Sequence, residues 1–312
     1  MIENGILHRL VLVSLALMLE ASCVSVETRN QRQSPAPARS TGDSQKVPAL
    51  PVPTPVVATQ QPVAPVRQKP VGGSAGCQTV STDTGIKTIS IPVGGHQRSF
   101  IRVVNDKYSN LTKHVLIIGY HGLGLDGTSP RRDHKWTDVE AMAADQAIFI
   151  YANALRGAWD ANDSTGDLEF FDEMVRTTGE IYCIDPKRVF VHGFSNGAFF
   201  VNDLVEVRKD AIRAVISVAG GGNGTTIPAM VIHGHADPSV GFSSYAPTLL
   251  NSYAAADGCA TPVNMASIPE GSCQTLTGCP EKLPVIFCPW DGNHHWPEFT
   301  LPDVWKFISS LQ

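Results

Sequence analysis

The sequence predicts an α/β fold in which helices cover both faces of a mostly parallel β-sheet. Continuous apolar runs recur along the chain, which is typical of strands buried on both faces of a sheet. Segments with helical spacing alternate with these runs. One run leads through Gly193-Phe-Ser-Asn-Gly197 into a helical segment, a pattern typical of a sharp turn that lifts a serine hydroxyl clear of the sheet. No stretch is long enough for a separate lid domain.

The strands and helices follow one another in regular order. Two alternating segments, 87–93 and 98–104, predict an antiparallel pair of edge strands. Apolar or β-branched runs predict further strands at 114–120, 147–152, 189–191, 214–219, 229–233 and 283–288. Helical spacing predicts helices at 137–146, 167–182, 245–256 and 301–311, and another that begins at Ala198. This alternation of strand and helix is what favours a parallel sheet.

The composition is that of a globular protein and does not favour nucleic acid as a partner. The 312 residues are 43% hydrophobic and 17% charged, which is sufficient for a large core. The net charge is −5 and no dense Lys/Arg cluster occurs, so nucleic acid and anionic membrane surfaces are poor candidate partners. The oligomeric state does not follow from these features.

Residues 1–23 predict an export signal. An apolar run at 10–19 follows basic residues and precedes small ones. Cys23 suggests a lipoprotein signal with a lipid anchor, the one membrane attachment we expect, although Glu20 stands where such a signal has an aliphatic residue. The sequence therefore predicts a protein that is either secreted or attached to the cell envelope.

Residues 24–76 predict a disordered linker ahead of one folded domain at 77–312. The linker is rich in Pro, Ala, Val, Gln, Ser and Thr and contains no aromatic residue. Such a segment buries too little apolar surface to offset the entropy lost on ordering. The linker would hold the folded domain away from the cell envelope.

Six cysteines follow the predicted signal and suggest disulfides. They are Cys77, Cys183, Cys259, Cys273, Cys279 and Cys288. In an exported protein six cysteines predict three disulfides, and the sequence does not choose among the fifteen possible pairings. A zinc site is not favoured, because Cys-x-x-Cys pairs and nearby histidines in ligand spacing are absent. We expect no metal and no other cofactor.

Three candidate catalytic groups follow the predicted strands in a consistent order. Ser195 is the candidate nucleophile, and Asp237, after the strand at 229–233, is the candidate acid. The loop after the last strand holds His294 and His295, either of which is able to accept the serine proton. Spacing alone does not separate these two histidines. The order serine, aspartate, histidine is that of the α/β-hydrolase fold.

The loop His121-Gly-Leu-Gly124 is the candidate oxyanion loop. In the α/β-hydrolase fold the loop after this strand and the residue after the nucleophile supply the backbone N–H groups of the oxyanion hole. We therefore expect Leu123 and Asn196 to be the donors, and His121 to support the loop without acting as the base.

Other polar and aromatic residues have weaker assignments. His233 and His235 form a close pair, but without a matching carboxylate cluster a metal site is not favoured. Asp167 and Asp172 are expected at solvated positions of a helix. Aromatic residues that are candidate walls of a substrate pocket are Trp159, Phe194, Phe199 and Trp296.

Together these motifs resemble the secreted feruloyl esterase and polyhydroxybutyrate depolymerase-like group of carbohydrate esterase family one. The resemblance covers Cys77 to Gln312 and rests on Tyr-His-Gly-Leu-Gly124, Tyr182-Cys-Ile-Asp-Pro-Lys-Arg-Val-Phe190, the serine pentapeptide, His233-Gly-x-x-Asp237-Pro, Asp257-Gly-Cys259 and Gly292-x-His294-x-Trp-Pro297. It implies a triad of Ser195, Asp237 and His294, because the family places Trp-Pro two residues after its catalytic histidine. Asn293, Ala198 and His295 depart from the family's usual residues.

The resemblance implies a serine carboxylic ester hydrolase that releases feruloyl or acetyl groups from plant cell-wall polysaccharide. A depolymerase of polyhydroxyalkanoate or another polyester is the alternative within the same chemistry. A non-catalytic envelope or binding protein on a hydrolase scaffold is the alternative of a different class. It predicts a lost triad residue, and none is lost here. The sequence also has Asn-x-Ser/Thr sequons at Asn110, Asn162 and Asn223.

Overall fold

The structure is a computed structural model that describes residues 72–161 and 165–311. The predicted signal at 1–23, Cys23, most of the predicted linker and the sequon at Asn162 lie outside these residues. Among the described helices, none has the length and apolar character needed to cross a membrane.

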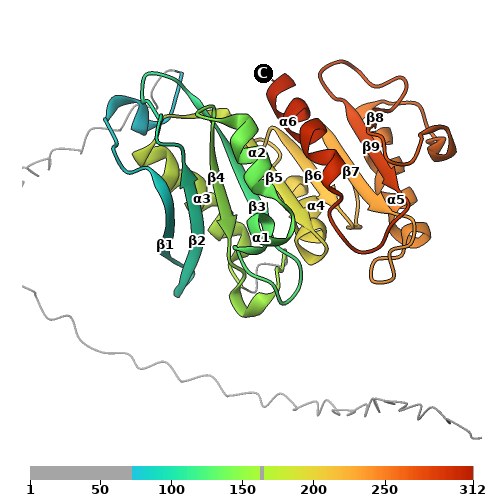
Figure 1. Cartoon of the computed structure of the whole chain (residues 1–312), viewed down its shortest axis with the longest axis horizontal. Coiled ribbons are helices and arrows are strands. Elements are labelled where there is room, and N and C mark those ends of the chain that lie inside the picture. The colour runs from blue at the N-terminus through green and yellow to red at the C-terminus, as the bar shows by residue number, and fades with distance from the viewer. Residues whose placement is uncertain (1–71, 162–164, 312) are drawn as a thin grey trace, which may run out of the picture. The chain divides into compact units, whose positions relative to one another are not determined.

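In the described part of the chain, nine strands form one sheet in the order β1-β2-β4-β3-β5-β6-β7-β9-β8 (Figure 1). The pairs from β4 through β3, β5, β6 and β7 to β9 are parallel. The pairs β1–β2, β2–β4 and β8–β9 are antiparallel. The strands are β1 Gly85–Val93, β2 His96–Val104, β3 His114–Tyr120, β4 Ala147–Ala152, β5 Ile184–Phe194, β6 Ala214–Val218, β7 Ala229–Gly234, β8 Gln274–Thr275 and β9 Val285–Trp290.

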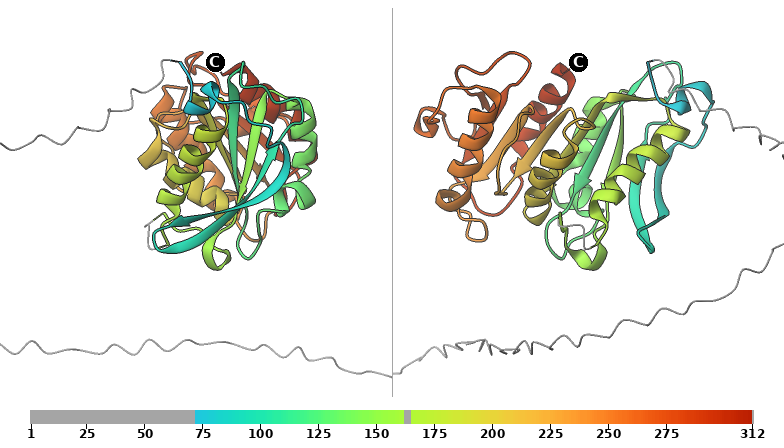
Figure 2. Two further views of the ribbon diagram at one scale, coloured as in Figure 1. Left: turned by 90° about the vertical axis from the view of Figure 1, so that its left-hand side faces the viewer. Right: turned by 180° about the vertical axis from the view of Figure 1, so that it is seen from behind.

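Helices pack on both faces of this sheet (Figure 2). The α-helices are α1 Ser129–Asp133, α2 Trp136–Ala143, α3 Asp167–Ile181, α4 Asn196–Arg208, α5 Phe242–Asp257 and α6 Leu301–Ser310. Apolar side chains of α3, α4 and α5 join one core cluster, whereas those of α2 and α6 join a second cluster on the opposite face. The predicted α/β-hydrolase architecture, with its antiparallel edge pair β1–β2, is confirmed.

Some element ends differ from the prediction. The helix predicted at 137–146 ends at Ala143. It ends there because Ala144 adopts a φ of 51°, which is incompatible with a right-handed α-helix. The last strand starts two residues later than predicted and runs on to Trp290. Two short elements, α1 and β8, were not predicted. Segments this short carry too few residues for a periodic pattern to show.

The prediction of three disulfides is confirmed, and the structure decides their pairing. Cys77 pairs with Cys183, Cys259 with Cys279, and Cys273 with Cys288. The last bond joins Cys273, which directly precedes the short strand β8, to Cys288 in its antiparallel partner β9.

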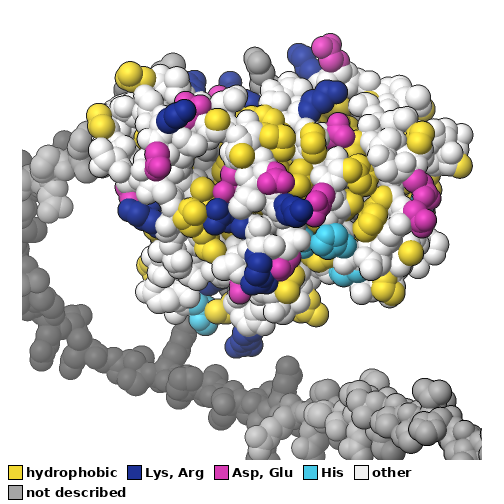
Figure 3. Space-filling view, in the orientation of Figure 1, with side chains coloured by type: hydrophobic (Ala, Val, Ile, Leu, Met, Phe, Trp, Pro, Cys, Tyr) yellow, Lys and Arg dark blue, Asp and Glu magenta, His cyan; other side chains and the backbone are white. Residues whose placement is uncertain are grey.

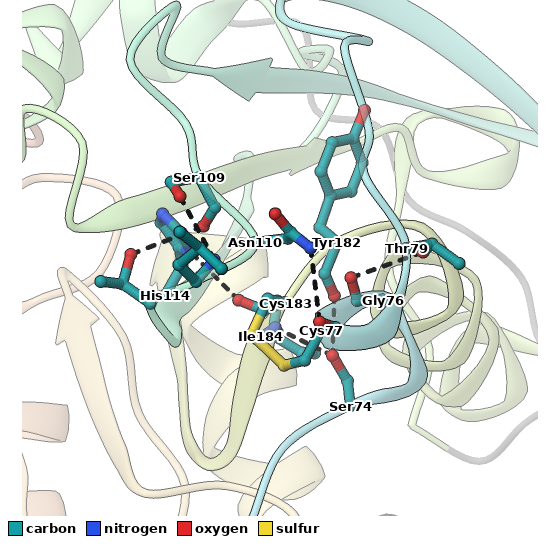
Figure 4. The surroundings of a disulfide bond; sticks show 12 residues. Ser74, Gly76, Cys77, Thr79, Ser109, Asn110, His114, Tyr182, Cys183 and Ile184 are labelled. Carbon is teal, nitrogen blue, oxygen red and sulfur yellow. Dashed lines mark hydrogen bonds between the residues drawn. A yellow bond between two sulfur atoms is a disulfide. The ribbon is translucent and has the colours of Figure 1, made fainter.

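The first disulfide joins the start of the described chain to the start of β5 (Figure 4). The Ser74 hydroxyl donates to the carbonyl of Tyr182 at 2.7 Å and accepts from the N–H of Ile184 at 2.9 Å. A Cβ on Gly76 would lie 2.3 Å from the Tyr182 backbone. Ser74 and Gly76, at the end of the segment predicted as a disordered linker, therefore already pack on the folded domain.

Candidate active site

Ser195 occupies a sharp turn between β5 and α4. Its φ of 55° and ψ of −121° are unfavourable for a residue with a side chain. A Cβ on Gly193 would lie 2.1 Å from the carbonyl oxygen of Gly197, and a Cβ on Gly197 would lie 2.3 Å from that of Tyr120. The turn can therefore form only with glycine at both positions, which explains the spacing found in the sequence.

Asp237 and His294 form a hydrogen-bonded pair. The Nδ1 atom of His294 lies 2.7 Å from Oδ2 of Asp237, and the aspartate is 6% exposed. The other carboxylate oxygen accepts the N–H groups of Ser239 and Val240, each at 2.8 Å. Because the imidazole donates through Nδ1 to a carboxylate, its Nε2 atom is left to accept a proton.

This pair lies beside the serine turn. The ring of His294 packs on the ring of Phe194, which directly precedes Ser195, with 4.8 Å between centroids. His295 is exposed, and its ring lies 6.0 Å from that of His134. Burial lowers the pKa of His134 to about 4, and the nearby His295 contributes to this shift. The structure thus brings His294 to Asp237 and places His295 elsewhere, a distinction that sequence spacing does not make.

The candidate oxyanion loop lies against the serine. A Cβ on Gly122 would lie 3.3 Å from Cβ of Ser195. The backbone N–H groups of Leu123 and Asn196, the predicted donors, have no backbone hydrogen-bond acceptor among the residues that the structure describes. The side chain of Leu123 is 69% exposed. Within the described residues, neither N–H group has a competing backbone partner, Asn196 directly follows Ser195, and the loop that carries Leu123 contacts Ser195 through Gly122.

His121 is a buried support of this loop. Its Nε2 accepts the N–H of Ala154 at 3.1 Å, and its Nδ1 faces the carbonyl oxygen of Gly122 at 2.8 Å. Burial lowers its pKa, which favours the neutral ring that these two bonds require.

The predicted pocket walls have little exposed surface. Trp159 is 5% exposed, Phe194 7% and Trp296 1%. The indole of Trp296 packs edge-on against Trp136 and His192, so it supports the loop that carries His294 from inside the core.

Phe199, the fourth predicted wall, is more exposed than these three residues, and so is its neighbour Tyr245. Their rings meet edge-on at 5.4 Å, and a Cβ on Gly221 would touch both rings. Tyr245 is 39% exposed, and its sequence position on a helix does not distinguish it from an aromatic core residue.

The two other histidines of the acid loop have separate partners. His233 donates through Nε2 to the carbonyl oxygen of Val240 at 2.7 Å. His235 Nδ1 lies 2.6 Å from Oε1 of Glu270. Within residues 72–161 and 165–311, no group of three or more His, Cys, Asp or Glu side chains could hold a metal ion.

The expectation that Asp167 is a solvated helix residue is wrong. Asp167 is fully buried at the start of α3 and pairs with Arg98 of β2 at 2.5 Å. Burial is possible because the charges neutralise each other and the carboxylate accepts further hydrogen bonds. Asp172 is partly exposed and pairs with Arg208 at 2.9 Å.

One face of the molecule carries histidine side chains close to hydrophobic ones (Figure 3). The candidate site combines a strained serine, a histidine hydrogen-bonded to a carboxylate, and an oxyanion loop. All three follow the carboxyl ends of parallel strands, namely β3, β5, β7 and β9. This arrangement is suited to acyl transfer through a covalent intermediate.

Comparison with curated proteins finds feruloyl esterases. Feruloyl esterase C of Emericella nidulans is 31% identical over 213 residues, which cover 63% of this chain and 76% of that protein. Feruloyl esterase D of Neurospora crassa is 25% identical over 265 residues, which cover 76% of this chain and 90% of that protein. No family model matches the chain.

Solved structures of esterases share the fold. An acetyl xylan esterase from Aspergillus awamori superposes with a TM-score of 0.56 at 15% identity, covering 72% of this chain and 99% of the other. A ferulic acid esterase of the CE1 group from Anaeromyces mucronatus superposes with a TM-score of 0.54 at 15% identity, covering 76% of this chain and 96% of the other. At these identities the likeness establishes the fold alone.

Proposed function

The chain belongs to the feruloyl esterases, carboxylic ester hydrolases of the α/β-hydrolase fold, and on that basis we propose a secreted serine esterase with a triad of Ser195, Asp237 and His294. Its proposed substrates are feruloyl or acetyl esters of plant cell-wall polysaccharide. The relatives are named for feruloyl ester cleavage, and one structural neighbour for acetyl xylan.

One observation carries the proposed mechanism. Asp237 holds His294 through Nδ1 at 2.7 Å, and the histidine ring packs on the residue that precedes Ser195. A carboxylate in this position fixes the imidazole tautomer and stabilises the imidazolium that forms during attack.

The proposed reaction has two stages. Nε2 of His294 takes the proton of the Ser195 hydroxyl while the oxygen attacks the ester carbonyl carbon. The N–H groups of Leu123 and Asn196 stabilise the negative charge on the carbonyl oxygen. The C–O bond breaks, and the departing alcohol receives the proton from His294. Water, activated by the same imidazole, then hydrolyses the acyl-enzyme and releases the free acid.

We propose that the acyl group lies against Phe194 and Trp159, whose exposed edges are small, so aromatic contact would involve only part of each ring. Trp296, 1% exposed, acts in this proposal by supporting the His294 loop from the core.

Export is part of the same proposal. Three disulfides support an oxidising compartment, because such bonds are rare in reducing ones. Mass spectrometry of the mature protein would test both the cleavage site and an acylated Cys23. An unprocessed N-terminus in the exporting cell would contradict the proposal.

A hydrolysis panel tests the function. Methyl ferulate, acetylated xylan, p-nitrophenyl acetate and polyhydroxybutyrate are each incubated with the protein and with Ser195→Ala. We expect turnover of ferulate or acetyl esters, and a loss of roughly 10⁴-fold or more in the variant. Activity that survives in Ser195→Ala contradicts the mechanism. Turnover of polyhydroxybutyrate alone would identify a polyester depolymerase, and no turnover by the folded protein would favour a binding role.

A further inference from the structure

We propose that Trp159 is a positioning residue that holds together the two segments that supply the oxyanion hole. This inference rests on the proposed function, because it takes Leu123 and Asn196 as the donors. Trp159 lies in the segment 153–161, here named the Trp159 loop, between β4 and α3.

Two hydrogen bonds from Trp159 reach the two oxyanion segments. The backbone N–H of Trp159 donates to the side-chain Oδ1 of Asn196 at 2.8 Å. Its indole Nε1–H donates to the carbonyl oxygen of His121 at 2.9 Å, and this second bond is buried. Asn196 carries one proposed donor on its own backbone, and His121 opens the loop that carries the other. A single residue thus connects the two.

Further contacts attach the oxyanion loop to the Trp159 loop. The N–H of Gly124 donates to the carbonyl oxygen of Gly157 at 2.8 Å, and His121 accepts the N–H of Ala154 at 3.1 Å. The His121 ring also packs against the indole of Trp159, with 5.1 Å between centroids. The residue after Leu123 and the residue two positions before it are therefore restrained by the same loop.

A buried ion pair fixes the Trp159 loop to the body of the fold. Arg98 is 2% exposed and Asp167 is fully buried, and they pair at 2.5 Å. The N–H of Asp160, next to Trp159, donates to the other carboxylate oxygen of Asp167 at 2.9 Å. Arg98 also donates to the carbonyl oxygen of Asn153 at 3.4 Å. The pair therefore holds the start of the loop and the residue after Trp159.

The indole ring is packed against two other aromatic rings. Its ring meets Tyr120 edge-on at 4.9 Å and stacks on Phe200 at 5.5 Å. Only 5% of Trp159 is exposed, so little of its surface can contact a substrate. Its backbone N–H and its indole N–H both donate hydrogen bonds within the site. Its neighbours therefore give Trp159 a positioning role in addition to the small exposed edge that it presents to the acyl group.

The expected consequence is specific to the transition state. Oxyanion donors act on the charge that develops during attack, so a misplaced donor lowers kcat and leaves ground-state binding nearly unchanged. Trp159→Phe keeps an aromatic ring between Tyr120 and Phe200 and removes the Nε1–H bond to His121. We expect kcat for methyl ferulate to fall by about 10-fold or more, with KM within about twofold.

Inhibitor affinities provide the second readout. A boronic acid forms a tetrahedral adduct that uses the oxyanion hole, whereas the product ferulate binds without one. In Trp159→Phe we expect the boronic acid to lose affinity in proportion to kcat while ferulate keeps its affinity. Equal losses for both ligands, or an unchanged kcat, would overturn the inference.

Matched variants separate the possible causes. Trp305→Phe makes the same exchange on α6, and wild-type kinetics are expected there. If Trp159→Phe does not fold, Asn196→Ala tests the other bond, since it removes Oδ1 and keeps the backbone N–H. The same selective loss of kcat is expected.

Ser195→Ala in the same assay distinguishes the failure of the two proposals. If Ser195→Ala is active, the proposed function is wrong. If Ser195→Ala is inactive and Trp159→Phe has wild-type kinetics, only the positioning role is wrong.

Discussion

At the scale of single residues, the serine turn is held by its neighbours rather than by its own preference. Ser195 keeps a φ of 55°, and its N–H donates to the carbonyl oxygen of Val218 at 3.0 Å. Strain of this kind persists only where the surrounding structure over-determines it. The strand β6 and the two glycines of the turn supply that constraint.

The two adjacent histidines of the last loop differ in their contacts, and a pair of variants tests the difference. His294→Ala removes the ring that bonds Asp237 at 2.7 Å, so kcat/KM for methyl ferulate should fall by about 10²–10⁴-fold or more. His295→Ala removes an exposed ring and should change kcat/KM by less than about threefold.

Steady-state kinetics on both variants, with circular dichroism as the folding control, check this assignment. If His295→Ala proves the more damaging change, the base assignment to His294 is wrong.

At the scale of elements, α5 ends in an unfavourable carboxylate. Asp257 is 2% exposed, and one of its oxygens accepts the N–H of Ile227 at 2.9 Å. The other oxygen has no hydrogen-bond partner among the described residues. Burial raises the pKa of Asp257 to about 7. A negative charge at the carboxyl end of a helix is also disfavoured by the helix dipole.

Asp257→Asn should therefore stabilise the protein near neutral pH. The folded pKa of about 7 exceeds the ordinary value of 3.8, so the folded chain binds more protons between these pH values and loses stability as the pH rises. The asparagine keeps an oxygen for Ile227 and carries no charge. We expect a gain of about 1–2 kcal/mol in the free energy of unfolding at about pH 8, shrinking toward about pH 4.

Urea unfolding across this pH range measures the gain. Asp106→Asn, at an exposed position, is the matched control and should leave the stability unchanged. A constant difference between Asp257→Asn and the parent at all pH values would contradict the titration of Asp257.

At the scale of the whole molecule, the disulfide between Cys77 and Cys183 joins positions 106 residues apart. A cross-link that closes a loop of this length lowers the conformational entropy of the unfolded chain. In the chain-entropy model this adds about 2–5 kcal/mol to the free energy of unfolding. Every contact described at the candidate site lies within residues 72–311. The proposed esterase domain should therefore function without the residues before Gly72.

A protein that begins at Gly72 should keep the kcat/KM and the thermal midpoint of the full chain. One that begins at Asp83 loses Cys77 and the Ser74 bonds to the start of β5, and its thermal midpoint should fall by several degrees. Calorimetry and the esterase assay measure both. A loss of activity in the first protein would contradict the proposed domain boundaries.

The fold class and the order of the candidate catalytic groups could be predicted from the amino-acid sequence. Strands such as β3 and β4 are buried along their whole length, so their sequences had to be continuously apolar. The serine turn required glycine at fixed positions for steric reasons that act within a few residues. Signals of this local kind can be read along the chain.

Contacts between residues far apart in the sequence could not be predicted in this way and follow from the folded structure. Asp237 and His294 are 57 positions apart, and Arg98 and Asp167 are 69 apart. The disulfide pairing and the burial of Asp167 depend on how β-strands and loops lie side by side. So does the hydrogen bond between His294 and Asp237, which the sequence indicated only through its resemblance to a family with Trp-Pro at this spacing. A hydrogen bond or a disulfide forms only at short distance, and distance between remote residues is a property of the folded chain.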